Sequence, residues 1–189
     1  MGTRHLICVY KGGEYKVAQY GQWDGYPSGQ GIDILQFLHT WDRPKFEKQV
    51  DKLTWITGAE YDKIPQKTLA DRAEFSRDTS AKLLPMIQNS KRKLKLVNNI
   101  DFAGDSLFCE WAYVIDLDEN TFEVFEGGMK IDRDKNDRED ITIIGRFDDY
   151  DTDGDYDTVK PVAVFALDDL PDADEFLNAI KLLQSKDYE

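Results

Sequence analysis

The chain has 189 residues, 41% of them hydrophobic and 12% aromatic, which is enough to bury one core without disulfides or structural metal ions. Its 37 acidic and 24 basic residues give a net charge of −13, which repels nucleic acid and anionic lipid and disfavours binding to a nucleic acid duplex. No segment approaches the roughly 20 apolar residues of a membrane span, so no membrane partner is expected. We expect one cytoplasmic domain over residues 1–189 that needs no cofactor.

Two β-strands joined by a tight turn are predicted at the start of the chain. Residues 5–10, HLICVY, are almost continuously apolar, whereas residues 14–20, EYKVAQY, alternate polar and apolar side chains. The Gly12-Gly13 pair between them can supply the positive φ of a hairpin turn. Because its apolar run is unbroken, the first strand is expected at the centre of a sheet that is covered on both faces.

Two helices are predicted next. From Ile32 onward the apolar residues recur at helical spacing, and Pro44 bounds this first helix. A second helix is expected to start there, with Phe46, Val50 and Leu53 on one face.

The following segment has a less regular pattern. Residues 58–65 are expected to form a loop, and residues 66–90 to hold one or two weaker helices that Pro85 kinks or divides. We interpret residues 66–95 as a helical insertion in the domain.

Strand character returns in the second half of the chain. A second hairpin is predicted from residues 106–118 and 121–128, and two further strands are predicted at residues 141–147 and 161–167. The order of elements predicts an α+β fold, in which two β-hairpins and two further strands form an antiparallel or mixed sheet. The two hairpins can lie side by side in that sheet.

The chain is expected to end in a helix. Phe176 and Ile180 belong to its apolar stripe. Asp172 and Glu175, three residues apart, match the spacing of a capping box at its start.

The cysteines and histidines suggest neither a disulfide nor a metal centre. Cys8 and Cys109 each lie in an apolar run, so buried thiols and a reducing compartment are expected. His5 and His39 stand alone, without the spacing of zinc ligands or a nucleophile motif nearby.

The strongest candidate for a functional site is the stretch QYGQWDGYPSGQG, residues 19–31, between the second strand and the first helix. Its aromatic side chains can stack on a planar or cationic ligand, its carboxylate can accept a hydrogen bond, and its glycine N–H groups can hold an anion. The predicted ligand-binding residues of this stretch are Tyr20, Trp23, Asp24, Tyr26, Gly29 and Gly31. The alternative is a purely structural turn, stiffened by Pro27, whose aromatic residues fill the core.

A second candidate is Glu110, which interrupts the apolar run of residues 107–115. A glutamate is rare in a covered strand unless it is paired, and Arg4 is a candidate partner. If the hairpins are neighbours, Arg4, His5, Asp24 and Glu110 converge near the loop, with Arg4 binding a ligand and Asp24 and Glu110 as catalytic candidates. Alternatively, Glu110 lies on a partly solvated face and Arg4 is a surface cation.

Residues 132–160 are interpreted as an acidic loop. Asp149, Asp151 and Asp153 match the first, third and fifth positions of a calcium-binding EF-hand loop, but Lys160 replaces the glutamate at its last position. These three residues are candidates for a calcium site of low affinity, and a solvated acidic loop explains them as well.

The N-terminal motifs carry a resemblance to a known family. These motifs are T-R at residues 3–4, the short hairpin, and W-D-G-Y-P-S-G-Q-G at residues 23–31. In them the chain resembles a widespread family of uncharacterised proteins from bacteriophages, bacteria and fungi. Their N-termini look like T-R-x-x-I, and a strand then leads to W-D-G-Y-P-x-G-x-G. The later stretch LFCEWAYVIDLDENTFEVFEG is similar to a second strand pair in larger members. The resemblance implies a cytosolic single-domain protein and transfers no activity.

Three functions remain open. The favoured one is a non-catalytic binding protein that recognises a small polar, nucleotide-like ligand or a peptide through the Trp-Asp-Gly-Tyr-Pro loop. The alternatives are a carboxylate-dependent hydrolase in which Asp24 and Glu110 share acid and base roles, and an acidic interaction or inhibitor protein acting through residues 132–157. We favour binding because recognition-type residues are clearer here than a matched nucleophile and base.

Overall fold

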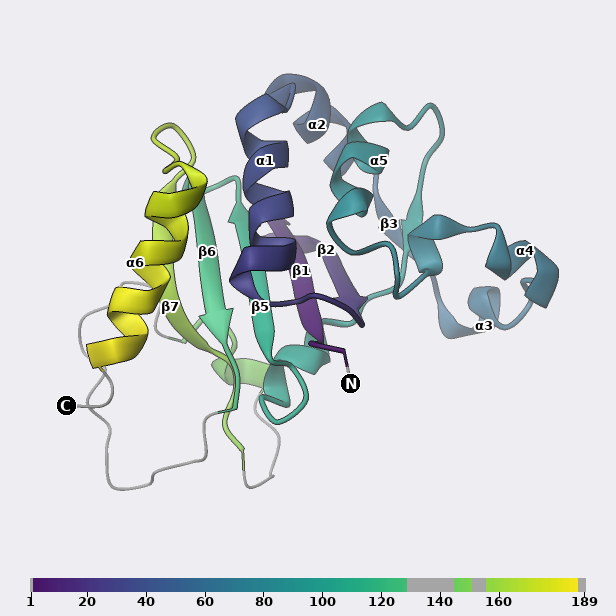
Figure 1. The fold of residues 1–189 in the computed structure, drawn as a ribbon. Helices are drawn as coiled ribbons and strands as arrows, with labels where there is room; N and C mark the ends of the chain where they lie inside the picture. Colours follow the sequence, from purple (N-terminus) through teal and green to yellow (C-terminus); the bar gives the residue numbers. More distant parts are fainter. Residues whose placement is uncertain (1, 129–144, 151–155, 187–189) are drawn as a thin grey trace.

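The computed structural model describes residues 2–128, 145–150 and 156–186, and it contains a five-stranded mixed sheet with helices on one face (Figure 1). The sheet order is β2-β1-β5-β6-β7, in which β1 and β5 are parallel and all other neighbours antiparallel. A separate small sheet pairs β3 with β4. The strands are β1 His5–Lys11, β2 Glu14–Gly21, β3 Thr54–Trp55, β4 Lys95–Leu96, β5 Trp111–Asp116, β6 Thr121–Glu126 and β7 Lys160–Ala166. The predicted α+β class is confirmed.

Both faces of the sheet are covered. Ile7 and Val9 of β1 pack with the helices, whereas Leu6 and Cys8 face the other side, where the 3₁₀ turn Ile100–Gly104 contributes buried side chains. The central, doubly covered position predicted for β1 is therefore confirmed. The helices are α1 Ile32–Thr40, α2 Arg43–Val50, α3 Gly58–Tyr61, α4 Gln66–Ala70, α5 Leu83–Asn89 and α6 Ala173–Lys186.

The two predicted hairpins are neighbours in the sheet because β1 pairs with β5. Gly12 and Gly13 turn the first hairpin at φ values of 66° and 78°, a region in which only glycine is unstrained. Their N–H groups donate to the Asp118 carboxylate at 2.8 and 2.9 Å, and these bonds lower the pKa of Asp118. Because Asp118 lies between β5 and β6, the bonds join the turns of the two hairpins.

The second hairpin is shorter than predicted at its start. Residues 106–110 are not part of a strand, because the N–H of Cys109 donates to the Asp105 carbonyl at 2.8 Å and closes a turn. Glu110 therefore precedes β5 instead of interrupting it. Cys8 and Cys109 are free and buried, as predicted.

The middle of the chain is more ordered than predicted. The expected loop over residues 58–65 is wrong at its start, where Thr57 and Glu60 form a capping box that begins α3. Pro85 lies in the first turn of α5, where a missing N–H costs no helical bond, so this helix is not divided. The two-residue strands β3 and β4 are too short for a periodic signal, and the sequence did not predict them.

The acidic part of the chain is only partly described. Of the strand predicted at residues 141–147, the last three residues form a turn and the others lie outside the described residues. The loop of residues 132–157 is likewise described only in part. Of the calcium candidates, Asp149 is exposed in a 3₁₀ turn, and Asp151 and Asp153 lie outside the described residues.

A buried group of charges fastens this turn to the sheet. Arg146 pairs with Asp116 at the end of β5, and its Nε lies 2.6 Å from Glu123 Oε2 on β6, while both carboxylate side chains are only 1% exposed. Burial raises the pKa of Glu123, and the Arg146 charge opposes that rise. The guanidinium also lies over the Tyr10 ring, 5.2 Å from its centroid, which is within the limit of about 6 Å for a cation–π contact.

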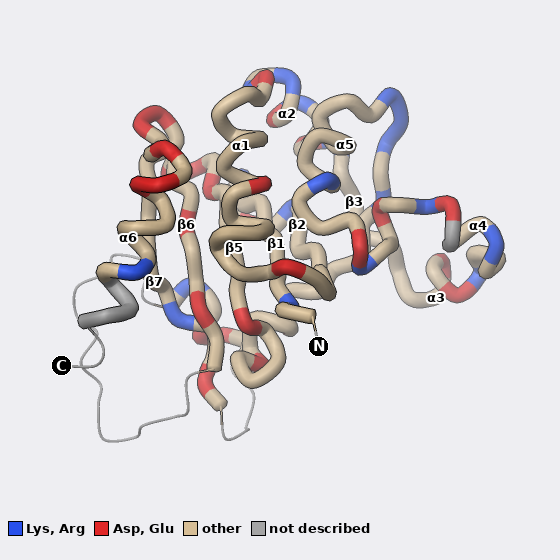
Figure 2. The backbone as a smooth tube through the Cα atoms, viewed as in Figure 1, with Lys and Arg blue, Asp and Glu red and all other residues tan. Residues whose placement is uncertain are grey.

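The short basic run KRKLK, residues 91–95, lies in the segment after α5 (Figure 2). Arg92 donates to Glu74 at 2.6 Å, and Lys95 pairs with Glu60 of α3. These pairs attach the run to α3 and to the 3₁₀ turn Ala73–Phe75, so part of its charge has a structural role.

The N-terminal cap of α6 provides a first test of the fold. The Glu175 N–H donates to the Asp172 carboxylate at 2.9 Å, and the Asp172 N–H donates to the Glu175 carboxylate at 3.0 Å, which confirms the predicted capping box. We expect Asp172→Ala to lower the free energy of unfolding by about 1 kcal/mol in urea denaturation. Glu175→Gln keeps an acceptor and is the control; an Asp172→Ala variant as stable as the control would contradict this role.

Candidate functional site

Several backbone N–H groups of the predicted loop make hydrogen bonds within the chain. The Gly25 N–H donates to the Thr3 carbonyl at 3.0 Å, and the Gly29 N–H donates to the Tyr26 carbonyl at 2.9 Å. The helix begins early, in the π-helical turn Pro27–Gly31 that runs into α1. A Cβ at Gly31 would lie 3.1 Å from the Phe176 ring, so this glycine permits close packing. The Gly29 N–H therefore already has a partner where an anion was expected.

The aromatic side chains of the loop lie at the surface. Trp23 and Tyr26 are 47% and 41% exposed, so neither fills the core as the structural alternative expected. The Trp23 Nε1–H donates to Asp78 at 2.8 Å, and the Tyr26 hydroxyl donates to Asp24 at 3.2 Å. Asp24 has a φ of 54°, an uncommon conformation for a residue with a side chain.

Arg4 and Glu110 form the predicted pair, and among the described residues no contact joins Asp24 to them. The Arg4 N–H donates to Glu110 Oε1 at 3.0 Å, and Arg4 Nε lies 3.7 Å from the same oxygen, with side chains 21% and 40% exposed. Gly25, next to Asp24, bonds to the carbonyl of Thr3, whereas Glu110 bonds to the N–H of Arg4. These two groups of one trans peptide point in opposite directions, so Gly25 and the Glu110 carboxylate attach to opposite sides of the N-terminal segment.

His5 is fully buried between two glycines. A Cβ would lie 2.2 Å from its ring at Gly21 and 2.8 Å from it at Gly25, so both glycines are needed for this packing. Burial lowers the pKa of His5 to about 4, although the nearby Thr3 carbonyl and the Asp24 charge oppose the shift. Neither ring nitrogen makes a hydrogen bond of regular geometry. The ring is therefore neutral near pH 7.

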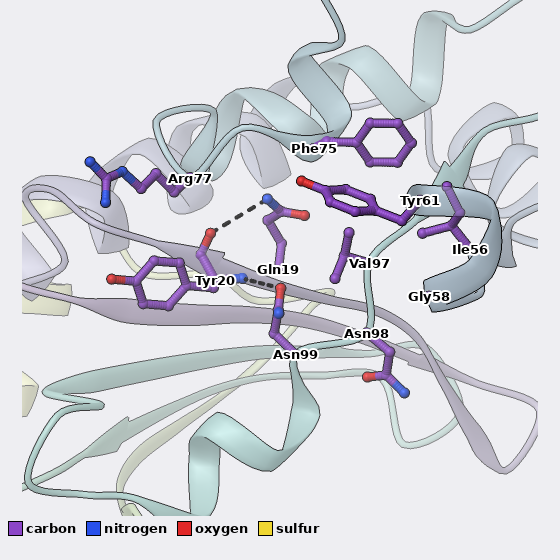
Figure 3. A pocket seen from close by; sticks show the side chains of 10 residues that line it. All are labelled: Gln19, Tyr20, Ile56, Gly58, Tyr61, Phe75, Arg77, Val97, Asn98 and Asn99. Atoms are coloured by element: carbon purple, nitrogen blue, oxygen red, sulfur yellow. Dashed lines mark hydrogen bonds between the residues drawn. The ribbon is translucent and has the colours of Figure 1, made fainter. Parts of the chain in front are cut away.

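A pocket of about 510 Å³ lies between β2 and the helical insertion (Figure 3). Its volume is in the range of about 300–1,000 Å³ that is typical of small-molecule sites. Of the predicted ligand-binding residues, only Tyr20 lines this pocket. The residues that line it are Gln19, Tyr20, Ile56, Gly58, Tyr61, Phe75, Arg77, Val97, Asn98 and Asn99.

One wall of the pocket is aromatic and firmly supported. The rings of Tyr61 and Phe75 meet edge to face with centroids 5.6 Å apart, and the Arg72 guanidinium covers Phe75 at 4.8 Å. Arg72 in turn donates to the buried Glu74 at 2.5 Å, as Arg92 does at 2.6 Å. Burial favours a raised pKa of Glu74, but the hydrogen bonds from Arg92, from the backbone and from Arg72 together outweigh it and lower the pKa. The ion pairs hold this wall in place.

Gln19 presents a buried acceptor without a partner. Its Nε2 donates to the Tyr20 carbonyl at 3.4 Å and to the Ser76 carbonyl at 3.2 Å, while its Oε1 makes no hydrogen bond although the residue is only 3% exposed. The amide cannot turn over, because Oε1 would then face two carbonyl oxygens. A buried acceptor left unpaired costs about 1–3 kcal/mol. Among the described residues that line the pocket, Gln19 thus carries a buried side-chain acceptor without a hydrogen-bond partner.

The outer edge of β2 next to the pocket is already hydrogen-bonded. The Tyr20 N–H donates to the Asn99 side chain at 3.3 Å, the Asn99 N–H donates to the Ala18 carbonyl at 3.0 Å, and the Gln22 N–H donates to the Arg77 carbonyl at 3.1 Å. Arg77, inside the helical insertion, and Asn99, after it, thus attach to this edge. They bring Arg77 and Asn99 to the rim of the pocket.

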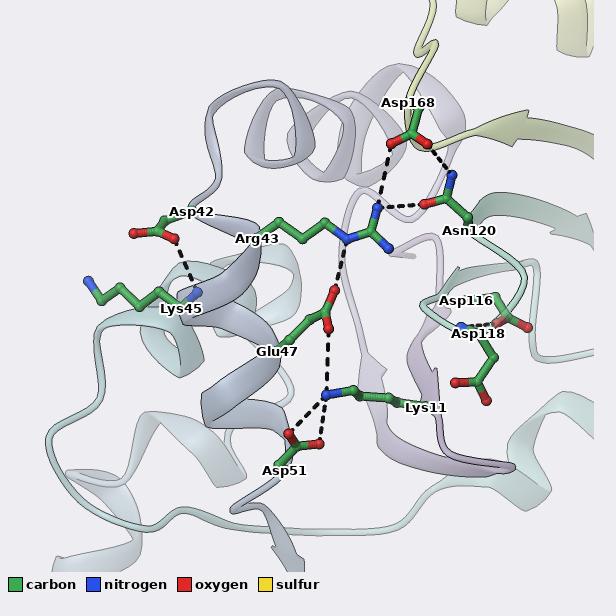
Figure 4. Close-up of polar contacts among 10 residues, drawn as sticks. All are labelled: Lys11, Asp42, Arg43, Lys45, Glu47, Asp51, Asp116, Asp118, Asn120 and Asp168. Atoms are coloured by element: carbon green, nitrogen blue, oxygen red, sulfur yellow. Dashed lines mark hydrogen bonds and ion pairs between the residues drawn. The ribbon is translucent and has the colours of Figure 1, made fainter.

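Another dense group of charges, near the turn between β1 and β2, is self-paired (Figure 4). Lys11 lies 2.8 Å from Asp51 and 3.6 Å from Glu47, and Arg43 lies 2.8 Å from the same Glu47. Arg43 also donates to the Asn120 side chain at 2.5 Å. These contacts join α2 to the turns of both hairpins, so we assign this group a structural role.

The described residues contain no group of three or more His, Cys, Asp or Glu side chains placed to hold a metal ion. Among those same residues, no helix has the length and apolar character needed to cross a membrane. Comparisons of the chain with protein-family models, curated proteins and solved structures find no significant match. The resemblance of the N-terminal motifs therefore stays a prediction.

No sequence pattern directly predicted the pocket. Its walls come from β2, from residues 56–77 and from residues 97–99, which are far apart in the chain. Gln19 and Tyr20 begin the stretch that the sequence singled out, so its composition pointed to the neighbourhood and not to the cavity.

Proposed function

We propose that this protein binds a small polar molecule with a flat ring, without chemistry, in the pocket between β2 and the helical insertion. The observation that carries the proposal is the unpartnered Oε1 of Gln19, buried beside an aromatic wall. A ligand that donates a hydrogen bond there removes the cost of an unpaired buried acceptor, and its ring packs against Tyr61 and Phe75.

The proposal keeps the binding role expected from the sequence and moves its centre from the Trp-Asp-Gly-Tyr-Pro loop to the pocket. Tyr20 links the two, and the bond between Trp23 and Asp78 connects the loop to the segment that contains Arg77. Among the described residues, neither a hydrolase based on Asp24 and Glu110 nor an acidic inhibitor has a comparable supporting contact.

Ligand-observed NMR with a panel of nucleosides, aromatic amino-acid amides and short peptides tests the proposal. We expect weak binding of flat, polar members of the panel, and a loss of at least tenfold in affinity in Phe75→Ala, because the variant removes half of the aromatic wall. Tyr26→Ala, which truncates an exposed aromatic side chain of the loop, is the matched control.

The two variants separate the two locations. Binding that survives Phe75→Ala and disappears in Tyr26→Ala would return the site to the loop. A panel in which nothing binds to the wild-type protein would overturn the proposal. Far-UV circular dichroism of each variant shows whether the fold is kept.

A further inference from the structure

The polar groups of the pocket differ in what they require. Gln19 Oε1 can only accept, so it requires an N–H or O–H from the ligand. Its Nε2 is already engaged with the Tyr20 and Ser76 carbonyls, so the glutamine is held in one orientation. A donor that meets it must reach a position from which water is largely excluded, since the residue is 3% exposed.

The aromatic wall favours a ligand with a flat ring. One side of Phe75 is covered by Arg72, and its neighbour Tyr61 meets it edge to face. A flat heteroaromatic ring makes offset or edge contacts with such a pair, whereas a saturated ring offers no π face. Figure 3 shows Gln19 rising from β2 on the side of the pocket where Tyr61 and Phe75 lie.

The opposite end of the pocket favours a ligand with a negative charge. The side chain of Arg77 is exposed and makes no ion pair or hydrogen bond within the part of the chain that the structure describes. In Figure 3 it lies above the Tyr20 ring, away from Tyr61 and Phe75. In a chain of net charge −13, an arginine at a pocket rim without an acidic partner among the described residues is a candidate to receive an anion.

From these three requirements we infer that the ligand is a free mononucleotide whose base carries an exocyclic amino group. The amino group donates to Gln19 Oε1, the base packs against Tyr61 and Phe75, and the phosphate pairs with Arg77. The inference rests on the proposed function and adds its ligand class. A polynucleotide is disfavoured, because the net charge of −13 opposes the approach of a long polyanion.

The test compares two matched pairs of ligands on the wild-type chain, so its outcome does not depend on whether a variant folds. Isothermal titration compares AMP with purine riboside 5′-monophosphate, which lacks only the amino group, and AMP with adenosine, which lacks only the phosphate. CMP and its analogue without the amino group repeat the first comparison on a smaller base. We expect each removal of a group to weaken binding at least tenfold, as loss of one hydrogen bond to a buried acceptor or of one charge-assisted pair does.

Two variants then assign each group to its residue. Gln19→Leu should remove the preference for the amino group and keep that for the phosphate, and Arg77→Gln should do the reverse. Wild-type protein that binds AMP no better than both analogues would overturn the ligand class, and the proposed function would still stand if Phe75→Ala weakens other members of the NMR panel. If AMP binds with both preferences but neither variant alters them, the nucleotide occupies another place and the inference is wrong.

Discussion

Arg146→Met is expected to lower the free energy of unfolding by about 3–5 kcal/mol at pH 7, because it leaves the buried Asp116 and Glu123 carboxylates without a counter-charge. Replacement of a whole buried ion pair by apolar groups is often neutral, whereas removal of one partner is strongly destabilising. Urea denaturation followed by circular dichroism measures the loss. We expect the deficit to be larger at pH 8 than at pH 5.

The pH dependence follows from Glu123. Burial already raises its pKa, and removal of the Arg146 charge, which opposes the rise, raises it further. The folded variant then binds a proton more tightly than the unfolded chain, so its stability increases as the pH falls and is lost as the pH rises through the folded pKa.

Two comparisons make this prediction specific. The double variant Arg146→Met/Glu123→Gln should recover part of the lost stability, because it removes one of the uncompensated charges. Lys95→Met, which breaks the surface pair with Glu60, is the control and should have a far smaller effect. Equal losses in Arg146→Met and Lys95→Met would show that the buried charges are not the cause.

His5 is expected to make the protein sensitive to acid. Its pKa is about 4 in the folded chain and 6.5 in the unfolded chain, so the unfolded state takes up a proton first as the pH falls. The contribution of the buried neutral ring is intact above pH 6.5 and is lost progressively as the pH falls to about 4. The total loss is about 3 kcal/mol, since one pKa unit corresponds to about 1.4 kcal/mol.

Denaturation at several pH values between 7 and 4 measures this loss, and the variant His5→Phe should have a shallower slope. His39→Gln removes the other histidine, which is exposed, and serves as the control. If both substitutions change the slope equally, burial of His5 does not explain it. NMR titration of the His5 ring in the wild-type chain checks the pKa directly, whether or not His5→Phe folds.

Much of the sheet could be predicted because its signals are local. The apolar run of β1, the Gly12-Gly13 turn and the alternation in β2 each lie within a few residues. Helix α3 had a local signal too, in the spacing of Thr57 and Glu60, but a four-residue helix offers no periodic stripe to support it. The parallel pairing of β1 with β5 was open, since strands far apart in the chain are joined by tertiary contacts that no local pattern records.

The candidate site was harder to predict than the fold. The stretch around Trp23 contains the residue types of a binding loop, yet Trp23 bonds to Asp78 and Tyr26 bonds to Asp24 at the surface. The role of Gln19 depends on two carbonyls, one of them at Ser76, more than fifty residues away. Such an orphan acceptor follows only from tertiary structure.

The hydrogen bonds along the outer edge of β2 also limit how a peptide can bind. An exposed edge strand can accept an added strand from another molecule, which gives affinity through main-chain bonds and carries a risk of aggregation. Here Asn99 and Arg77 use the outward-facing groups of Ala18, Tyr20 and Gln22. Strand addition is therefore blocked beside the pocket, and a ligand must be recognised by side chains, a mode that favours compact molecules over extended ones.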